Sequence, residues 1–255
     1  MIQNILVAVG DAPHEKNALD YAGHLAVLLN APHISCVFFQ NAGGGDRAEA
    51  LTNRVLENVE AECAQYEFLD YHVEAVIGKP PEMIRQKARS ADLVVIGIPA
   101  SIKTDGLKLV YDQIDDVLLN ITKPTIVVHE QCTLLREILV VHRGDAYSDR
   151  VLELATELGE RTKASLSGLA IAEYQQKAEE IAQQMRGYLR FHDVKAEFMT
   201  RLGFTVVNIL ETASAQDCDL IAVSASHHGK LYEMIFQSTT EGVVKMANRA
   251  VMVVR

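Results

Sequence analysis

Short apolar runs alternate with amphipathic segments along the whole chain. Residues 4–9 read NILVAV, and a later run that begins with Asp92 reads DLVVIG. Such continuous apolar runs are typical of parallel strands that are covered on both faces. Between the first two runs, apolar residues recur at helical spacing: Ala18, Leu19, Ala22, Leu25, Ala26 and Leu29. Strands that alternate with helices predict an α/β fold with a doubly wound parallel sheet.

The rest of the first half continues this alternation. Further strands are expected at residues 33–40, 71–78 and 125–129. A helix is expected to start near Asp46, whose side chain would cap the free amides at its N-terminus. Its buried face is expected to hold Leu51, Val55, Val59 and Cys63.

The whole pattern then restarts. The sequence REILVVHRGDA at 136–146 repeats the character of IQNILVAVGDA at 2–12. Ile138 follows Ile5 by 133 residues, Gly203 follows Gly78 by 125, and Asp219 follows Asp92 by 127. This internal duplication predicts two domains, residues 1–130 and 131–255. The linker is short and not rich in Gly or Ser, so we expect the halves to pack together.

Charge and cysteine usage restrict the classes of partner and compartment. A formal net charge of −10 argues against nucleic acids and anionic membranes as partners. No apolar run reaches the roughly 18 to 20 residues of a membrane-spanning helix. The first ten residues have no basic segment before the apolar ones, so we expect a strand there and no signal peptide. The cysteines form no CxxC pair, which suits packing residues in a reducing cytoplasm: Cys36, Cys63, Cys132 and Cys218.

The order of motifs in each half resembles the universal stress protein family. The shared features are a first strand such as ILVAVG, a glycine between the third strand and the next helix, an Asp-Leu strand, and a closing TIVV or VMVV strand. The resemblance covers nearly the whole chain, twice. It implies two five-stranded domains of strand order 3-2-1-4-5, similar to adenine nucleotide α-hydrolases. It also implies an internal pseudo-dimer paired through the last strands, either as a monomer or in a further homo-oligomer.

Nucleotide-binding members of that family carry an Asp after the first strand and a G-x-x-G-x(9)-G-[ST] motif after the fourth. Glycines let backbone amides approach the phosphates, and the N-terminus of the last helix favours anions. Both halves depart from this pattern: Gly10 and Arg143 stand at the Asp position, and Asp112 would place a negative charge near a phosphate. The candidate nucleotide-binding residues are Arg143, Gly144, Ser224, His227, Gln237 and Ser238 in the second half, and Asp11 and Gly97 in the first.

These departures favour a cytoplasmic, non-catalytic regulatory or scaffolding protein of the stress response. We expect protein partners, no metal and no resident cofactor. The alternative is a stress sensor that holds ATP or AMP in the second half. A third class, an enzyme of the wider adenine nucleotide α-hydrolase family, requires a pyrophosphate-binding motif that we do not find. Adjacent His227 and His228 are interpreted as solvated loop residues, because neighbouring residues rarely present both rings to one ion.

Overall fold

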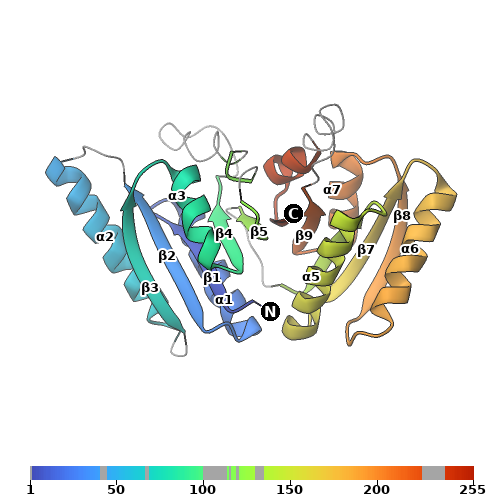
Figure 1. The fold of residues 1–255 in the computed structure, drawn as a ribbon, viewed down its shortest axis with the longest axis horizontal. Helices are drawn as coiled ribbons and strands as arrows, with labels where there is room; N and C mark the ends of the chain where they lie inside the picture. The colour runs from blue at the N-terminus through green and yellow to red at the C-terminus, as the bar shows by residue number, and fades with distance from the viewer. Residues whose placement is uncertain are drawn as a thin grey trace. The chain divides into compact units, whose positions relative to one another are not determined.

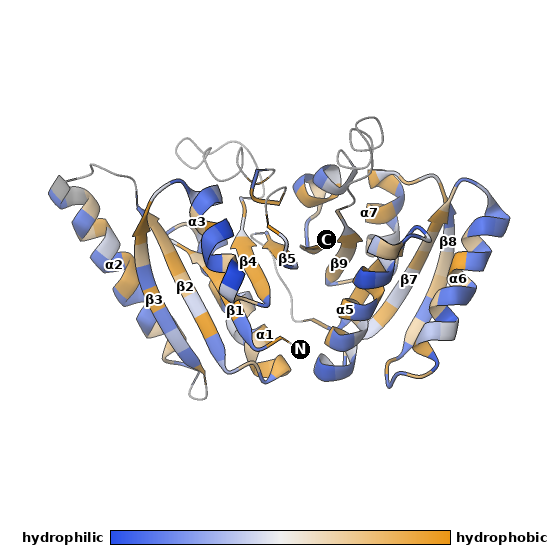
Figure 2. Cartoon of the chain, in the orientation of Figure 1, coloured by the Kyte–Doolittle hydropathy of each residue, from blue (hydrophilic) through white to orange (hydrophobic). Residues whose placement is uncertain are grey.

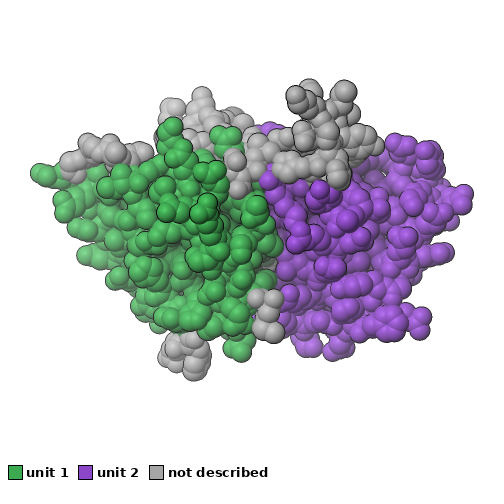
Figure 3. Space-filling model, in the orientation of Figure 1, with its two compact units in different colours: residues 1–132 green, residues 133–255 purple. Residues whose placement is uncertain are grey.

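The computed structural model of this 255-residue chain divides into two compact units, residues 1–132 and 133–255 (Figure 3). The structure describes residues 2–40, 45–66, 69–99, 114, 116–118, 121–129, 135–225 and 239–255. Each unit is a parallel sheet whose strands alternate with helices along the chain (Figure 1). The α/β fold that the sequence predicts is confirmed.

The sheet of the first unit has the strand order β3-β2-β1-β4-β5, with parallel neighbours throughout. Its strands are β1 (Asn4–Val9), β2 (His33–Gln40), β3 (Asp70–Ile77), β4 (Leu93–Gly97) and β5 (Thr125–Val128). Its described helices are α1 (Pro13–Leu29), α2 (Gly45–Cys63), α3 (Pro80–Lys87) and the short η1 (Ala88–Ser90). The order reverses between β1 and β4, so a crevice is expected at their carboxyl ends.

The second unit repeats this arrangement. Its sheet has the order β8-β7-β6-β9-β10, again with parallel neighbours. Its strands are β6 (Glu137–His142), β7 (Ser165–Ala172), β8 (Ala196–Leu202), β9 (Leu220–Ser224) and β10 (Ala250–Val254). Its helices include α5 (Ala146–Thr162), α6 (Gln175–Leu189) and α7 (Val206–Ala215), and residues 239–246 are also helical. The order reverses between β6 and β9, the counterparts of β1 and β4.

The core of each unit lies around its central strands. Every residue of β4 and of β9 is buried. Helix α1 packs on β1 and β4, and α5 packs on β6 and β9. Figure 2 shows apolar central strands and polar outer surfaces on helices such as α6. Burial of each large apolar side chain contributes about 1.5–3 kcal/mol, so the apolar runs that predicted the strands also supply much of their stability.

One aspartate fastens the start of the first strand in each unit. Asp92 Oδ2 accepts hydrogen bonds from the amides of Gln3 and Asn4, at 2.9 and 3.0 Å. Asp219 Oδ2 accepts from the amides of Arg136 and Glu137, at 2.8 and 3.0 Å. The Asp-Leu motif that marks the repeat in the sequence therefore has the same structural role twice.

Two expectations for α2 are wrong. Leu51 was expected on the buried face but is 40% exposed, whereas Thr52 is buried. With 3.6 residues per turn, the positions three and four residues before Val55 both lie near its face of the helix. In α2 the buried one is Thr52, three residues before Val55, and Leu51 is exposed. Asp46 lies inside the first turn of a helix that begins at Gly45, so it is not the N-cap.

In the described part of the chain, no helix combines the length and the apolar character that crossing a bilayer requires. The expected pairing of the two halves through their last strands stays a prediction. The same holds for the expected state of association, whether a monomer or a homo-oligomer.

Candidate functional site

The carboxyl ends of β6 and β9 bring together two of the residues predicted from the sequence. Arg143 directly follows β6, and Ser224 is the last residue of β9. Nη2 of Arg143 donates a hydrogen bond to Oγ of Ser224 at 3.1 Å. In doubly wound sheets, ligands bind at this point, where the strand order reverses. The second unit therefore places a positive charge and a hydroxyl at the usual binding position of its fold.

Further contacts hold the Arg143 guanidinium in place. Its Nη2 lies 3.1 Å from Oδ2 of Asp145, and its central carbon lies 4.8 Å from the centre of the Phe204 ring. Only 10% of the arginine side chain is exposed. A guanidinium that is ion-paired and stacked on an aromatic face is held in a fixed orientation, which suits bidentate contact with a carboxylate or a phosphate. An incoming anion would nevertheless have to compete with the Asp145 carboxylate.

Asp145 also occupies the N-terminus of α5. Its Oδ1 accepts hydrogen bonds from the amide and the hydroxyl of Ser148, both at 2.8 Å. The Ser148 hydroxyl in turn accepts from the Arg143 amide at 3.2 Å. An N-cap carboxylate satisfies free amides and interacts favourably with the helix dipole. A protein carboxylate therefore already stands where the helix would attract an anion.

Gly144 and His142 fix the turn that carries Arg143. Gly144 has a φ of 79°, a conformation that favours glycine, and its amide donates to Nδ1 of His142 at 3.0 Å. Nε2 of the same ring lies 3.0 Å from Oδ1 of Asp149. Because the Gly144 amide can only donate, Nδ1 is the acceptor. The ring proton therefore lies on Nε2, which donates a hydrogen bond to the Asp149 carboxylate. Burial is the main cause that lowers the pKa of His142 below 6.5.

The other predicted residues of the second unit are not placed. His227, Gln237 and Ser238 lie outside the described residues, so their part in the site stays a prediction. The chain is described again from Thr239, and the hydroxyl of Thr240 donates to the Ser224 carbonyl at 3.1 Å. Both threonines are buried, and Thr240 therefore ties the start of this last segment to the end of β9.

In the first unit, Glu15 fills the space at the end of β1. A Cβ on Gly10, the counterpart of Arg143, would lie 2.1 Å from Oε2 of Glu15. The same oxygen accepts a hydrogen bond from the Ala12 amide at 3.0 Å and so satisfies a free amide at the start of α1. Burial is the main cause that raises the pKa of Glu15, and the charge of Asp11 raises it further. A helix residue thus supplies the carboxylate that the strand end lacks.

Asp11 and Gly97, the candidates in the first unit, are engaged by the protein itself. The Asp11 carboxylate forms ion pairs with Arg54 and, at 3.6 Å, with Lys16. A Cβ on Gly97 would lie 2.0 Å from the carbonyl oxygen of His14, because the first turn of α1 packs directly on the end of β4. The structure therefore gives Gly97 a packing role and gives Asp11 two cationic partners.

The two units use different side chains to cap the helix that follows the first strand. In the first unit the N-cap is Ala12, and Glu15 in the first helical turn caps from inside the helix. In the second unit the N-cap is Asp145, and Ser148 takes the place of the glutamate. Neither Glu15 nor Asp145 was predicted from the sequence. The signal was available, because Pro13 followed by Glu15 in the first turn marks the start of α1, and an Asp directly before a helical segment, as at Asp145, is a typical N-cap.

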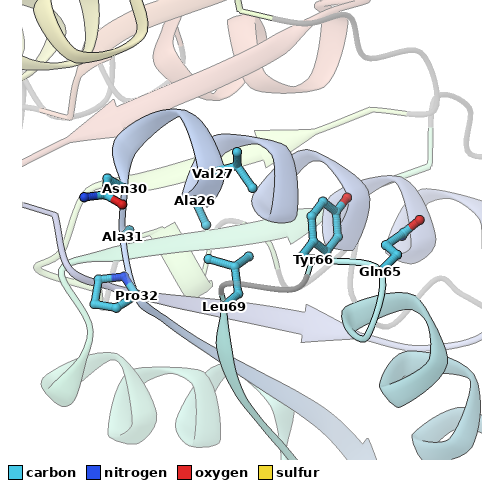
Figure 4. A pocket seen from close by; sticks show the side chains of 8 residues that line it. All are labelled: Ala26, Val27, Asn30, Ala31, Pro32, Gln65, Tyr66 and Leu69. Atoms are coloured by element: carbon cyan, nitrogen blue, oxygen red, sulfur yellow. The ribbon is translucent and has the colours of Figure 1, made fainter.

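A pocket of about 390 Å³ lies at the amino ends of β2 and β3 (Figure 4). Its lining is Ala26, Val27, Asn30, Ala31, Pro32, Gln65, Tyr66 and Leu69. Pro32 directly precedes β2 and Leu69 directly precedes β3, so the pocket is remote from the strand ends that carry the candidate residues. Among the described residues, no three His, Cys, Asp or Glu side chains gather as metal ligands.

The sequence was compared with the profiles of known protein families, and the result agrees with the repeated α/β fold. The sequence matches the profile of the universal stress protein family over residues 1–129 and again over residues 135–255. The chain belongs to the universal stress protein family. Its two matches make it a tandem member, as the resemblance of its motifs implies. No curated protein matches the sequence significantly.

Solved structures show the same fold in other universal stress proteins. A universal stress protein from Archaeoglobus fulgidus DSM 4304 is 18% identical, with a TM-score of 0.85 over 100% of this chain and 99% of that chain. A protein of Pseudomonas aeruginosa UCBPP-PA14, described as a universal stress protein, is 17% identical, with a TM-score of 0.73 over 99% and 93%. The cytoplasmic domain of a prokaryotic cation chloride cotransporter is 15% identical, with a TM-score of 0.56 over 99% and 95%. At these identities the likeness concerns the fold alone.

Proposed function

We propose that this tandem universal stress protein is a non-catalytic regulatory or scaffolding protein that acts in the cytoplasm on protein partners. The observation that carries the proposal is that a side chain of the protein fills the space at the end of β1. There the Glu15 carboxylate occupies the space beside Gly10, and Asp11 directly follows that glycine. The family resemblance places an acidic residue here in nucleotide-binding members too, so the charge alone does not argue against a ligand. What supports the proposal is that the Glu15 carboxylate already occupies this space and the Ala12 amide.

The missing glycines of the motif also weaken a phosphate site. A nucleotide site that lacks two amide-to-phosphate hydrogen bonds loses about 3–6 kcal/mol, at roughly 1.5–3 kcal/mol for each bond to a charged group. Because about 1.4 kcal/mol corresponds to a tenfold change in affinity, a micromolar site becomes millimolar or weaker. In the first half Gly97 keeps the first glycine of the motif, but Ala100 stands at the second. This supports a first unit that works without a nucleotide.

Nucleotide analysis of the purified protein tests the proposal. The full chain is purified, denatured and filtered, and the released small molecules are quantified by mass spectrometry. We expect far less than one ATP, ADP or AMP per chain. One or more nucleotides per chain would overturn the proposal as stated. A steady release of phosphate from added ATP would instead favour the third class, an enzyme of the α-hydrolase family.

A second candidate function has an observation of its own. The hydrogen bond between Arg143 and Ser224 places a guanidinium at the strand ends of the second unit, where an ATP or AMP sensor would hold phosphate. The Asp145 carboxylate at 3.1 Å competes for the same guanidinium. The balance between that ion pair and a bound phosphate decides whether the second unit has a measurable nucleotide affinity.

Three matched variants separate this candidate from the first. Arg143→Ala should weaken any ATP or AMP affinity by roughly 10- to 100-fold, the effect of losing one charge-assisted bond. Asp145→Asn should strengthen it, because asparagine still caps α5 but no longer neutralises the guanidinium. Arg201→Ala removes the same charge from an exposed position on β8 and is the control. Affinity that survives Arg143→Ala would place any nucleotide elsewhere.

A further inference from the structure

Two thiols from different elements of the first unit meet in its core. Cys36 lies on β2 and Cys63 is the last residue of α2, and their Sγ atoms are 3.8 Å apart. Cys36 is fully buried and Cys63 is 3% exposed. The two residues are 27 positions apart in the sequence, so no CxxC pattern reveals them. The fold alone brings them together.

We propose that Cys36 and Cys63 are an oxidisable dithiol that closes reversibly to a disulfide. The oxidant is a hydroperoxide, and a small thiol or dithiol is the reductant that reopens the bond. The proposal concerns a modification site within the first unit. It is independent of what the strand ends of either unit bind.

The geometry requires only a short approach. The sulfur atoms must move from 3.8 Å to about 2.05 Å. Strand β2 pairs with β1 on one side and β3 on the other, so Cys36 stays fixed. Cys63 ends its helix and is followed by a turn in which the Tyr66 amide donates to the Cys63 carbonyl at 3.0 Å. Because helix ends open at little cost, the last turn of α2 can supply the movement.

The reaction balances as two displacement steps. The Cys63 thiolate attacks an oxygen of the hydroperoxide, so an S–O bond forms, the O–O bond breaks, and water or an alcohol leaves after protonation. The Cys36 sulfur then attacks the Cys63 sulfur, so the S–S bond forms and the S–O bond breaks. The leaving hydroxide takes the Cys36 proton as water. Two electrons pass from the sulfur pair to the peroxide.

The two thiols differ in pKa, and this difference indicates which one attacks the peroxide and which one then closes the disulfide. A hydrogen bond from the Cys36 thiol lowers the pKa of Cys63, although burial and the nearby Glu62 act in the opposite direction. The same bond and burial raise the pKa of Cys36. The thiolate is the reactive form of cysteine, and Cys63 is also the more exposed of the two. Cys63 is therefore the first to react.

Cys218 in the second unit provides a matched comparison. It is buried like the pair, but burial raises its pKa to about 12, and the Ser167 hydroxyl is its hydrogen-bonding neighbour. A buried cysteine in such surroundings is inert toward oxidants. Burial alone therefore does not define the proposed site; the neighbouring sulfur does.

The experiment uses the wild-type chain of 255 residues. Reduced protein is treated with hydrogen peroxide, its remaining thiols are alkylated, and non-reducing digests are analysed by mass spectrometry. We expect one linked peptide pair that joins Cys36 to Cys63 and disappears after treatment with dithiothreitol. The oxidised protein should melt at a higher temperature, because the bond restricts the unfolded chain over the intervening loop. Cys218→Ser should give the same linked pair, and Cys63→Ser should give none.

Three outcomes would overturn the proposal. They are the absence of the linked pair at peroxide concentrations that oxidise exposed methionines, a sulfinic or sulfonic acid on Cys63 without a link, and a link to any other cysteine. The linked pair is measured in the wild-type protein, so the test remains valid even if Cys63→Ser does not fold.

Discussion

The Glu15 carboxylate stands where a side chain on Gly10 would have to lie, with Oε2 only 2.1 Å from the position of the missing Cβ. The glycine at position 10 is therefore required by the position of the Glu15 side chain. The strand end lacks a side chain, and the first turn of α1 supplies a carboxylate in its place. Because this carboxylate is partly buried, its charge is costly, and that cost gives the first prediction.

Glu15→Gln should stabilise the protein at neutral pH. Burial raises the pKa of Glu15 above 4.5, so the folded state favours the protonated acid. The stability that this group contributes is fully present below pH 4.5 and is lost as the pH rises through the raised pKa. Glutamine still accepts the hydrogen bond from the Ala12 amide but carries no charge. The melting temperature of the variant should exceed that of the wild type at pH 7, and the difference should shrink toward pH 4.5.

Glu57→Gln is the control for this experiment, because Glu57 is exposed on α2 in the same unit and its replacement removes the same charge. A Glu15→Gln variant that is less stable than the wild type at pH 7 would show that the charged carboxylate contributes more than its burial costs. That result would contradict the account of the first strand end.

Gly97→Ala should destabilise the first unit. The new Cβ would lie 2.0 Å from the His14 carbonyl oxygen, a backbone atom that can move only with the first turn of α1. Such overpacking costs about 1–3 kcal/mol or more. Gly187→Ala in α6 is the matched opposite, because its Cβ would meet nothing within 4 Å. It should gain about 0.5–1 kcal/mol. Urea denaturation measures both, and equal effects would refute the packing role of Gly97.

Asp219→Ala should lower the free energy of unfolding by about 2–4 kcal/mol, because two backbone amides at the start of β6 lose their charged acceptor. Asp219→Asn keeps one acceptor oxygen and should lose less. Asp193→Ala removes a carboxylate that is 95% exposed and pairs only at the surface with Lys163, at 3.4 Å. This control should stay within about 0.5 kcal/mol of the wild type. Chemical denaturation in which Asp219→Ala matches Asp193→Ala would contradict the proposed fastening.

Stability should fall as the pH drops below 6.5, in part through His142. Burial lowers the pKa of this histidine despite the facing carboxylates of Asp149 and Asp145, and the neighbouring Arg143 lowers it further. Its contribution is present above pH 6.5 and is lost as the pH falls through the lowered pKa. His142→Asn can still accept from the Gly144 amide but does not titrate. Its melting temperature should be lower at pH 7 and should depend less on pH between 7 and 5. An unchanged pH dependence would count against this role.

Most of the fold could be predicted from the sequence, because each strand of the core is a short apolar run. The residues from Leu93 to Gly97 and from Leu220 to Ser224 form strands in which every residue is buried. The repeated aspartates before them keep the same hydrogen bonds. Leu51 was misplaced because a helical pattern does not tell where the buried stripe ends near a helix terminus.

The site was less predictable, because side chains distant in the sequence determine its chemistry. Arg143 and Ser224 were predicted from motif spacing, and the structure brings them together. The sequence does not show that Asp145 would compete for the arginine. It also does not show that Cys36 and Cys63, interpreted as scattered packing residues, would meet through the contact of α2 with β2.

Calorimetric titration of magnesium ATP into the full-length protein tests the central claim most directly, because heat reports both binding and turnover. In the first unit Glu15 occupies the space beside Gly10, and in the second unit Asp145 pairs with Arg143. The account predicts only the heat of dilution up to millimolar ATP. A saturable heat with a micromolar dissociation constant, or a steady heat flow from hydrolysis, would contradict it.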